Sequence, residues 1–160
     1  MAMIRKASAV RKKLHMLIYG EQGTGKSRTA MQLCYLKNAD GKPFRVLYLD
    51  TENGSIDNYT EELEANGVNP DNLLIVYTQS LAEVQDYIKM VTNDEDIEDE
   101  NGDVYLDADS KPFRADALVV DSASILKMTA TQGLTAFSQK RAKVKAASQG
   151  LTGDEKAVKI

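Results

Sequence analysis

A chain of 160 residues with 42% apolar and 28% charged residues has the composition of one globular domain, not of a disordered, collagenous or fibrous protein. The single cysteine and single histidine argue against a disulfide framework, a multi-cysteine zinc site and a histidine-based metal centre. The formal net charge at pH 7 is −4, so the chain as a whole is not a nucleic-acid-binding polycation.

The N-terminal part of the chain predicts a basic arm, a strand and a helix. Residues 1–13 carry five Lys/Arg and no acid, and we expect them to form the arm. The run 14–19, Leu-His-Met-Leu-Ile-Tyr, predicts a buried strand that ends at Gly20. Good helix formers extend from Lys26 to about Lys37, and a cluster of helix breakers follows at 38–43.

The next segments continue the alternation of strands and helices. Residues 44–50 predict a second strand, and a polar loop follows it. Residues 57–66 predict a helix that ends at Gly67, a natural left-handed C-cap. A third strand is predicted at 73–77, and a capping-box pattern at Ser80 begins another helix.

An acidic stretch interrupts this pattern. Residues 94–109 hold nine acids and no base, so the rest of the chain carries net positive charge. Asn101-Gly102 is typical of a hairpin turn, and we expect a solvated, mobile acidic hairpin within an insertion at about 93–115. A calcium loop is disfavoured, because Asp99 stands where the EF-hand spacing requires glycine.

Residues 117–120 predict a fourth strand that ends at Asp121. Residues 127–160 are expected to be helical or loose, with seven Lys/Arg against two acids. Strands that are unbroken apolar runs and alternate with helices predict an α/β fold, with a mainly parallel sheet covered by helices on both faces. No internal repeat is evident.

Neither a membrane span nor a targeting segment is predicted. No apolar run approaches about 18 residues, and the basic N-terminus has no signal-peptide pattern. We therefore expect a soluble, cytoplasmic protein without a membrane partner.

Gly20–Ser27, with the sequence GEQGTGKS, matches the phosphate-loop pattern G-x-x-x-x-G-K-[ST] at every position. A predicted strand precedes it and a predicted helix follows, which disfavours an ordinary glycine-rich loop. Backbone N–H groups of such a loop bind phosphate oxygens, the lysine reaches the β- and γ-phosphates, and the serine hydroxyl ligates Mg²⁺. The residues expected to bind the nucleotide are Gly20, Glu21, Gln22, Gly23, Thr24, Gly25, Lys26, Ser27 and Arg28.

Two further acidic positions follow predicted strands. Asp121 ends an apolar strand at the sheet edge where ligands bind, and it is expected to hold Mg²⁺ with Ser27, directly or through water. The alternative is a helix-capping aspartate. At the end of the second strand, Asp50 and Glu52 are both candidates to activate the attacking water, and the alternative is a solvated polar turn.

The segments GEQGTGKS, VLYLDTENG and ALVVDSASIL resemble, in this order, the three core motifs of RecA-like P-loop ATPases. The resemblance covers about residues 14–126 and implies that Glu52 is the catalytic glutamate and Asp121 the metal-associated aspartate. It also implies ATP or ADP with Mg²⁺ as ligands, and a homo-oligomer with a shared active site. The basic arm and the segment after it are similar to phage-encoded members, some of which act in single-strand DNA annealing.

The chain departs from that family after the fourth strand. A complete RecA-like core continues with further strands and DNA-contacting loops, whereas only residues 127–160 follow here without a convincing apolar strand. The chain is therefore expected to be the N-terminal part of such a domain. No arginine can be assigned as an arginine finger.

Our first hypothesis is a Mg²⁺-dependent ATPase, phage or prophage encoded, that acts on DNA in replication, recombination or annealing. In it, Lys26 neutralises phosphate charge and Glu52 activates water. The alternatives are a non-hydrolysing nucleotide-binding module and a P-loop kinase, although no lid or acceptor-binding arginine cluster is recognisable. Bases near the C-terminus either contact a phosphate backbone or form a solvated helix face. These are Lys140, Arg141, Lys143 and Lys145.

Overall fold

The core of the fold is a three-stranded parallel sheet. The computed structural model describes residues 14–148; the predicted basic arm and the end of the C-terminal segment lie outside this range. The strands are β1 (Val46–Asp50), β2 (Leu73–Tyr77) and β3 (Ala117–Asp121), in the order β2-β1-β3. The register places Asp50 opposite Asp121, so the carboxyl ends of the strands lie at one edge.

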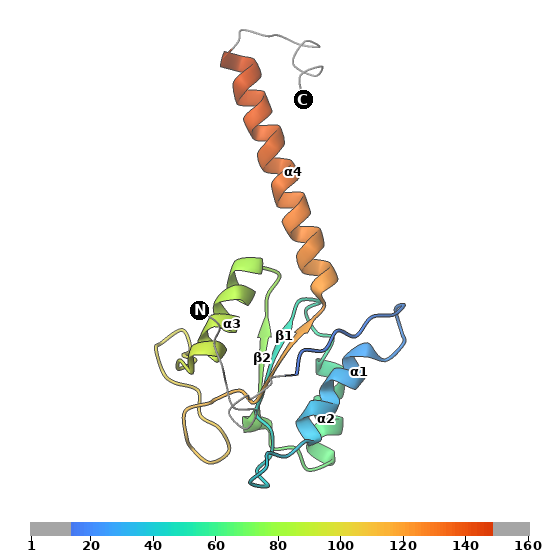
Figure 1. Cartoon of the computed structure of the whole chain (residues 1–160), viewed down its shortest axis with the longest axis vertical. Helices are drawn as coiled ribbons and strands as arrows, with labels where there is room; N and C mark the ends of the chain where they lie inside the picture. The colour runs from blue at the N-terminus through green and yellow to red at the C-terminus, as the bar shows by residue number, and fades with distance from the viewer. Residues whose placement is uncertain (1–13, 149–160) are drawn as a thin grey trace, which may run out of the picture.

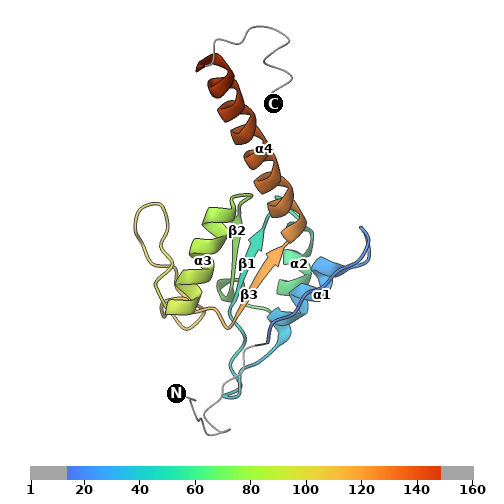
Figure 2. The ribbon, with the colours of Figure 1, turned by 45° about the horizontal axis from the view of Figure 1, so that its top comes forward.

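Helices cover both faces of the sheet, and Figure 2 shows α3 on one face and α1 with α2 on the other. This arrangement confirms the predicted α/β fold with a parallel sheet between helices. The helices are α1 (Lys26–Met31), α2 (Asp57–Ala65), α3 (Leu81–Asn93) and α4 (Ala123–Ser148), with short 3₁₀ helices η2 (Gln32–Tyr35) and η3 (Pro70–Asn72).

Alternation along the central strand divides the core into two clusters. Successive side chains of β1 point to opposite faces, and all five of its residues are buried because both edges and both faces are covered. Tyr48 packs with residues of α1, η2 and α2, whereas Leu47 and Leu49 pack with Val84 of α3 and with Phe113.

Local sequence signals predicted several helix ends correctly. Ser80 caps α3 by accepting a hydrogen bond from the Glu83 backbone N–H, and Gly67 follows α2 with a φ of +86°. The predicted helix from Lys26 ends early, because Leu36 adopts an extended conformation and its carbonyl accepts a hydrogen bond from Phe44 N–H. That bond closes a hairpin, which ends the helical pattern.

The predicted buried strand at 14–19 is not formed. The segment is exposed and pairs with none of the three strands; Leu14 is 82% exposed and Tyr19 is 89% exposed. An apolar run shows that burial would be favourable, but strand formation also needs hydrogen bonds to a neighbouring strand. Residues 14–19 form no such bonds with the open edges of β2 and β3, which corrects the prediction.

Helix α4 projects from the carboxyl end of β3, well beyond the body of the domain (Figure 1). Its first turns pack on the sheet through Leu126, whereas Leu134, Phe137 and Val144 are exposed. The helix contains bases but no Asp or Glu, in keeping with the basic character predicted from 127 onward. No helix within residues 14–148 is long and apolar enough to cross a membrane.

The acidic insertion is docked on the body, which corrects the prediction of a free, solvated hairpin. A turn at Asn101-Gly102 forms as predicted, with an antiparallel bridge between Glu98 and Val104. Ile97 and Phe113, however, are buried in the core beneath α3. A count of charges does not reveal these two apolar residues, which anchor the acidic stretch to the core.

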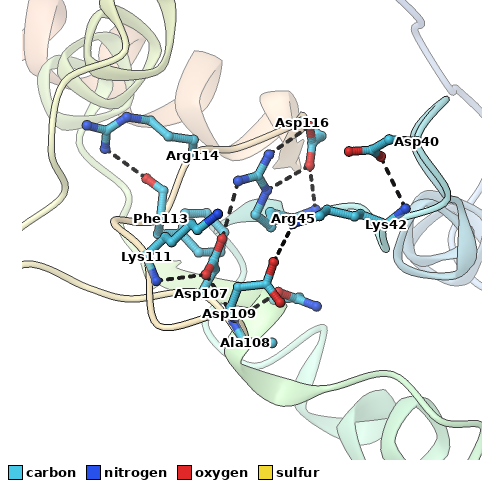
Figure 3. A network of polar contacts seen from close by, with 11 residues as sticks. Asp40, Lys42, Arg45, Asp107, Ala108, Asp109, Lys111, Phe113, Arg114 and Asp116 are labelled. Carbon is cyan, nitrogen blue, oxygen red and sulfur yellow. Dashed lines mark hydrogen bonds and ion pairs between the residues drawn. The ribbon is translucent and has the colours of Figure 1, made fainter.

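Ion pairs hold the insertion to the chain before β1 (Figure 3). Arg45 Nη1 donates to Asp107 at 3.3 Å, and Arg45 Nε donates to Asp116 at 3.0 Å. Lys42 Nζ bonds Asp109 at 2.6 Å. The acids of this stretch therefore serve partly as structural partners, and the Asp107 side chain is only 5% exposed.

A second hairpin of the insertion, with an antiparallel bridge between Leu106 and Pro112, belongs to an internal repeat that the sequence analysis missed. Residues 38–45 read NADGKPFR and residues 107–114 read DADSKPFR. The backbone hydrogen bonds match: Asn38 N–H donates to the Lys42 carbonyl, and Asp107 N–H donates to the Lys111 carbonyl. Each copy leads into a strand, β1 or β3. Repeat folds are recognised by periods of about 20–50 residues, so a search for such periods does not detect a repeat of eight residues.

Replacing Arg45 by Met is expected to lower the free energy of unfolding by about 2 kcal/mol, because the buried Asp107 carboxylate loses a charged donor. The matched control is Arg114→Met, the same position in the second copy, whose bond to Asp96 lies in a more exposed setting. It should cost less than about 1 kcal/mol. Urea denaturation of both variants measures the difference, and equal losses would contradict the role of Arg45.

The ion pair between Arg45 and Asp116 predicts an acid dependence of stability. Burial acts to raise the pKa of Asp116, but hydrogen bonds from the side chain and backbone of Arg45 outweigh it and hold that pKa below its ordinary 3.8. This stabilisation is complete above pH 3.8 and is lost as the pH falls through the folded-state value. The Arg45→Met variant should therefore lose less stability than the parent on acidification in that range.

Candidate functional site

The loop before α1 needs glycine for its backbone conformation. Gly23 has a φ of +79° and Gly25 a φ of +81°, and a Cβ at either position would meet no atom within 4 Å. Glycine is therefore required by the left-handed backbone and not by crowding. Gly25 is also the N-cap of α1, and its carbonyl accepts the first helical hydrogen bond, from Thr29 N–H at 2.9 Å.

The Lys26 side chain folds back over this loop. Its Nζ donates to the carbonyl oxygens of Gly20 at 3.0 Å and Glu21 at 2.7 Å. Thr24 Oγ1 also donates to the Glu21 carbonyl, at 2.8 Å. The ammonium group thus lies at the loop, and its two bonds are to exposed carbonyls that water can satisfy instead.

Arg28 is directed away from the loop. Its guanidinium donates to Glu62 of α2 at 2.8 Å, and this bond is the main cause of a raised Arg28 pKa. Both side chains are largely exposed. Of the residues predicted to bind the nucleotide, Arg28 could therefore contribute through its backbone, while its side chain ties α1 to α2.

At the carboxyl edge of the sheet, the Tyr48 hydroxyl lies beside two predicted site residues. It donates to Asp121 Oδ2 at 2.6 Å, and the side chains of Ser55 and Ser27 lie near enough to act on the pKa of the phenol. Ser55 Oγ donates to the same Asp121 oxygen at 3.4 Å. Burial raises the Tyr48 pKa, and the bond to Asp121 raises it further, so the phenol stays protonated. Ser27 and Asp121 therefore both lie beside the Tyr48 hydroxyl.

The donor set at that point suits a magnesium ion that arrives with a ligand. A serine hydroxyl and a carboxylate are hard oxygen donors, which Mg²⁺ prefers. Within residues 14–148 no group of three or more His, Cys, Asp or Glu side chains could hold a metal alone. Ser27 and Asp121 would thus supply two positions, and phosphate oxygens and water would supply the others, as is usual for Mg²⁺ bound with a nucleotide.

The two carboxylates after β1 lie in different surroundings. Asp50 is fully buried and accepts hydrogen bonds from the backbone N–H groups of Glu52, Gly54 and Ile56, at 2.9, 3.0 and 3.4 Å. Its oxygens thus hold the loop after the strand. The Glu52 side chain is exposed, and its Oε1 accepts a hydrogen bond from Ser122 Oγ at 2.8 Å.

Backbone and side-chain bonds between β1 and β3 continue past the strand ends. Thr51 N–H donates to the Asp121 carbonyl at 2.7 Å. Thr51 Oγ1 donates to the Ser122 carbonyl and accepts from the Ser122 N–H, both at 2.8 Å. The peptide bond between Asp121 and Ser122 is cis. This ladder holds Glu52 and Asp121 at the same edge.

Sequence reasoning missed the polar residues that connect the predicted ones, namely Tyr48, Thr51, Ser55 and Ser122. One signal was present: Tyr48 is the only polar-tipped residue among the aliphatic positions of its strand, two residues before Asp50 and thus on the same face. A buried hydroxyl needs a partner, so such a residue predicts a polar contact at that face.

The comparisons point to one family. Residues 12–153 match a family model described as an AAA domain. No curated protein and no solved structure gives a significant match to the chain.

Proposed function

This chain belongs to the AAA domain family of P-loop NTPases, and from this we propose that it binds ATP and ADP with Mg²⁺ and hydrolyses ATP. The observation that carries the proposal is that Ser27 and Asp121 both lie beside the Tyr48 hydroxyl, next to a loop that matches the phosphate-binding pattern. Each of the two has the donor chemistry expected of a magnesium ligand.

Phosphate binding would use the loop backbone and Lys26. The N–H groups around Gly23 and Gly25 provide donors, and the start of α1 adds the positive end of its dipole. Lys26 Nζ exchanges its bonds to the loop carbonyls for bonds to phosphate oxygens. Ser27 and Asp121 would hold Mg²⁺, which would supply positive charge against the negative charge that develops on the phosphate oxygens.

We assign the water-activating role to Glu52. Its carboxylate is exposed at the edge that holds Asp121, and Ser122 orients one of its oxygens. Asp50 is the weaker candidate, because its oxygens are occupied by the backbone of the following loop. Sequence spacing alone left the two equivalent, and their environments favour Glu52.

No arginine within residues 14–148 is engaged at the edge that holds Asp121. The four arginines in the described residues are engaged away from this edge: Arg28 with Glu62, Arg45 with Asp107 and Asp116, Arg114 with Asp96, and Arg141 over the Phe137 ring. This supports the proposal of a homo-oligomer with a shared active site.

The finer assignment is to the RecA-like branch, phage or prophage encoded, with single-stranded DNA as a partner in recombination, replication or annealing. It is supported by the order of the three motifs within a proposed core of 14–126. The bases of α4 support the DNA partner, since the helix carries no acid and begins at the edge that holds Asp121.

A thermal-shift experiment tests nucleotide binding, and phosphate release tests hydrolysis. Mg²⁺ with ATP or ADP should raise the melting temperature, because a ligand bound only by the folded state stabilises it. Phosphate release should be measured with and without single-stranded DNA. A thermal shift without release in either condition would favour the alternative, a module that binds nucleotide and does not hydrolyse it.

Affinity for single-stranded DNA is expected to fall steeply with salt, with a slope of log affinity against log salt of about −0.7 per phosphate contacted. Changing Lys140, Arg141 and Lys143 to Gln should reduce that slope, which a fluorescence-anisotropy titration at several salt concentrations measures. Lys89→Gln on α3 is a control that should leave it unchanged. A slope that does not respond to the triple change would show that α4 is not the DNA contact.

A further inference from the structure

We propose that Tyr48 is a positioning residue for the magnesium site, and that its hydroxyl orients Asp121 toward the cation. This inference rests on the proposed nucleotide binding and extends it to a residue that no part of the phosphate-loop pattern contains. Tyr48 itself does not touch the cation in this proposal; it acts through Asp121, to which it is hydrogen bonded.

The position of the Tyr48 hydroxyl is set by the core. The residue lies in the middle of the central strand and is 0% exposed. Its ring packs in the cluster that includes Met31, Ile56 and Val119, from α1, the loop before α2, and β3. Close packing on each side leaves the ring little freedom, so the hydroxyl stays at a fixed point beside Asp121.

The hydrogen bonds around this hydroxyl have a defined direction. Tyr48 carries one proton and donates it to Asp121 Oδ2 at 2.6 Å. Since this proton is used, the Tyr48 oxygen can only accept any further hydrogen bond, and the contact with Asp121 has a single direction.

The same bonds orient the Asp121 carboxylate. Ser55 also donates to Oδ2, at 3.4 Å, and Oδ1 takes part in neither bond. Two donors on one oxygen fix the rotation of the carboxylate and leave the other oxygen for the metal. Outer partners of this kind commonly change metal affinity by about 10- to 100-fold when they are removed.

The hydroxyl can be removed while the ring is kept. Tyr48→Phe preserves the packing volume, and Tyr59→Phe is the matched control, because Tyr59 lies on α2 and packs against the same cluster without bonding Asp121. Ser55→Ala is a second variant that removes the weaker donor to the same oxygen. Thermal melts in EDTA establish that each variant is folded.

The measurement is the fluorescence of N-methylanthraniloyl-ADP bound to the full chain, titrated with MgCl₂. Tyr48→Phe should raise the half-saturating Mg²⁺ concentration by about 10-fold, while the affinity for the nucleotide in EDTA stays at the parent value. Ser55→Ala should raise the half-saturating Mg²⁺ concentration by about 3-fold, and Tyr59→Phe should leave it at the parent value. A purely structural role of Tyr48 would lower the melting temperature without moving the Mg²⁺ dependence.

The outcomes separate this inference from the function on which it rests. If the parent binds the nucleotide and Tyr48→Phe has the parent's Mg²⁺ dependence, the positioning role is wrong and nucleotide binding stands. If Tyr48→Phe does not fold, the test passes to Ser55→Ala, which removes the other donor to Asp121 Oδ2. An unchanged Mg²⁺ dependence in Ser55→Ala then overturns the inference. If the parent does not bind the nucleotide with or without Mg²⁺, both proposals fail.

Discussion

Lys26→Ala is expected to remove most of the thermal shift that Mg²⁺ and ATP produce, while the melting temperature without nucleotide stays that of the parent. The side chain supports no part of the core, because its bonds are to the exposed carbonyls of Gly20 and Glu21. Loss of the ammonium should therefore affect phosphate binding and leave folding intact.

The size of this effect follows from mass action. A ligand at about 100 times its dissociation constant stabilises the folded state by about 2.7 kcal/mol, which for a chain of this length is a shift of about 5–10 °C. If the variant binds about 100-fold more weakly, the stabilisation falls below about 0.5 kcal/mol. Differential scanning fluorimetry with and without ATP resolves these two values.

The control for this prediction is Lys89→Ala. Lys89 is an exposed lysine on α3 that pairs with Asp86, so its loss removes the same charge far from the loop. The control should keep the full shift. If Lys26→Ala also keeps the full thermal shift, the assignment of residues 20–27 as the phosphate loop is wrong.

Glu52→Gln is expected to lower ATP hydrolysis by about 10²- to 10⁴-fold with ATP affinity nearly unchanged. The amide keeps the size of the side chain and can still bond Ser122, but it cannot accept a proton from water. Because the protein mainly positions groups in phosphoryl transfer, the loss should appear in turnover and not in binding. Phosphate release under single-turnover conditions, with single-stranded DNA present, measures it.

Asp50→Asn is the matched control and should lose activity for a different reason, namely a loss of stability. Asp50 accepts three backbone hydrogen bonds within the core, and an amide cannot accept them all, so we expect a loss of about 1–3 kcal/mol in stability. Its residual activity should follow the fraction of folded protein. Parent-like turnover by Glu52→Gln, together with a folded but inactive Asp50→Asn, would show that the base was assigned to the wrong residue.

The sequence predicted most of the fold because its signals are local. The apolar runs at 73–77 and 117–120 are strands within one residue of their predicted ends, and Ser80 and Gly67 bound helices as expected. Unbroken apolar runs arise when a strand is buried on both faces, and cap residues act within one turn of the chain. Such features need no knowledge of distant contacts.

Two failures of the sequence analysis involve partners distant in the chain. The run 14–19 has the composition of a buried strand, but it pairs with no strand in the structure. The acids of the insertion suggested a solvated hairpin, whereas Arg45 binds Asp107, which is 62 positions later. Whether a charge is solvated or paired depends on what the fold places beside it, and spacing along the chain does not report that.

The candidate site shows the same division. The sequence by itself determined the phosphate-loop pattern at 20–27, because glycines at set positions and a lysine follow from local backbone conformation. It also placed acids at the ends of β1 and β3. Only the tertiary structure decided between Asp50 and Glu52, by burying the first under backbone donors and exposing the second. Only it brought the Tyr48 hydroxyl into hydrogen-bond contact with Asp121. These choices depend on burial and on contacts between strands, which exist only once the sheet is formed.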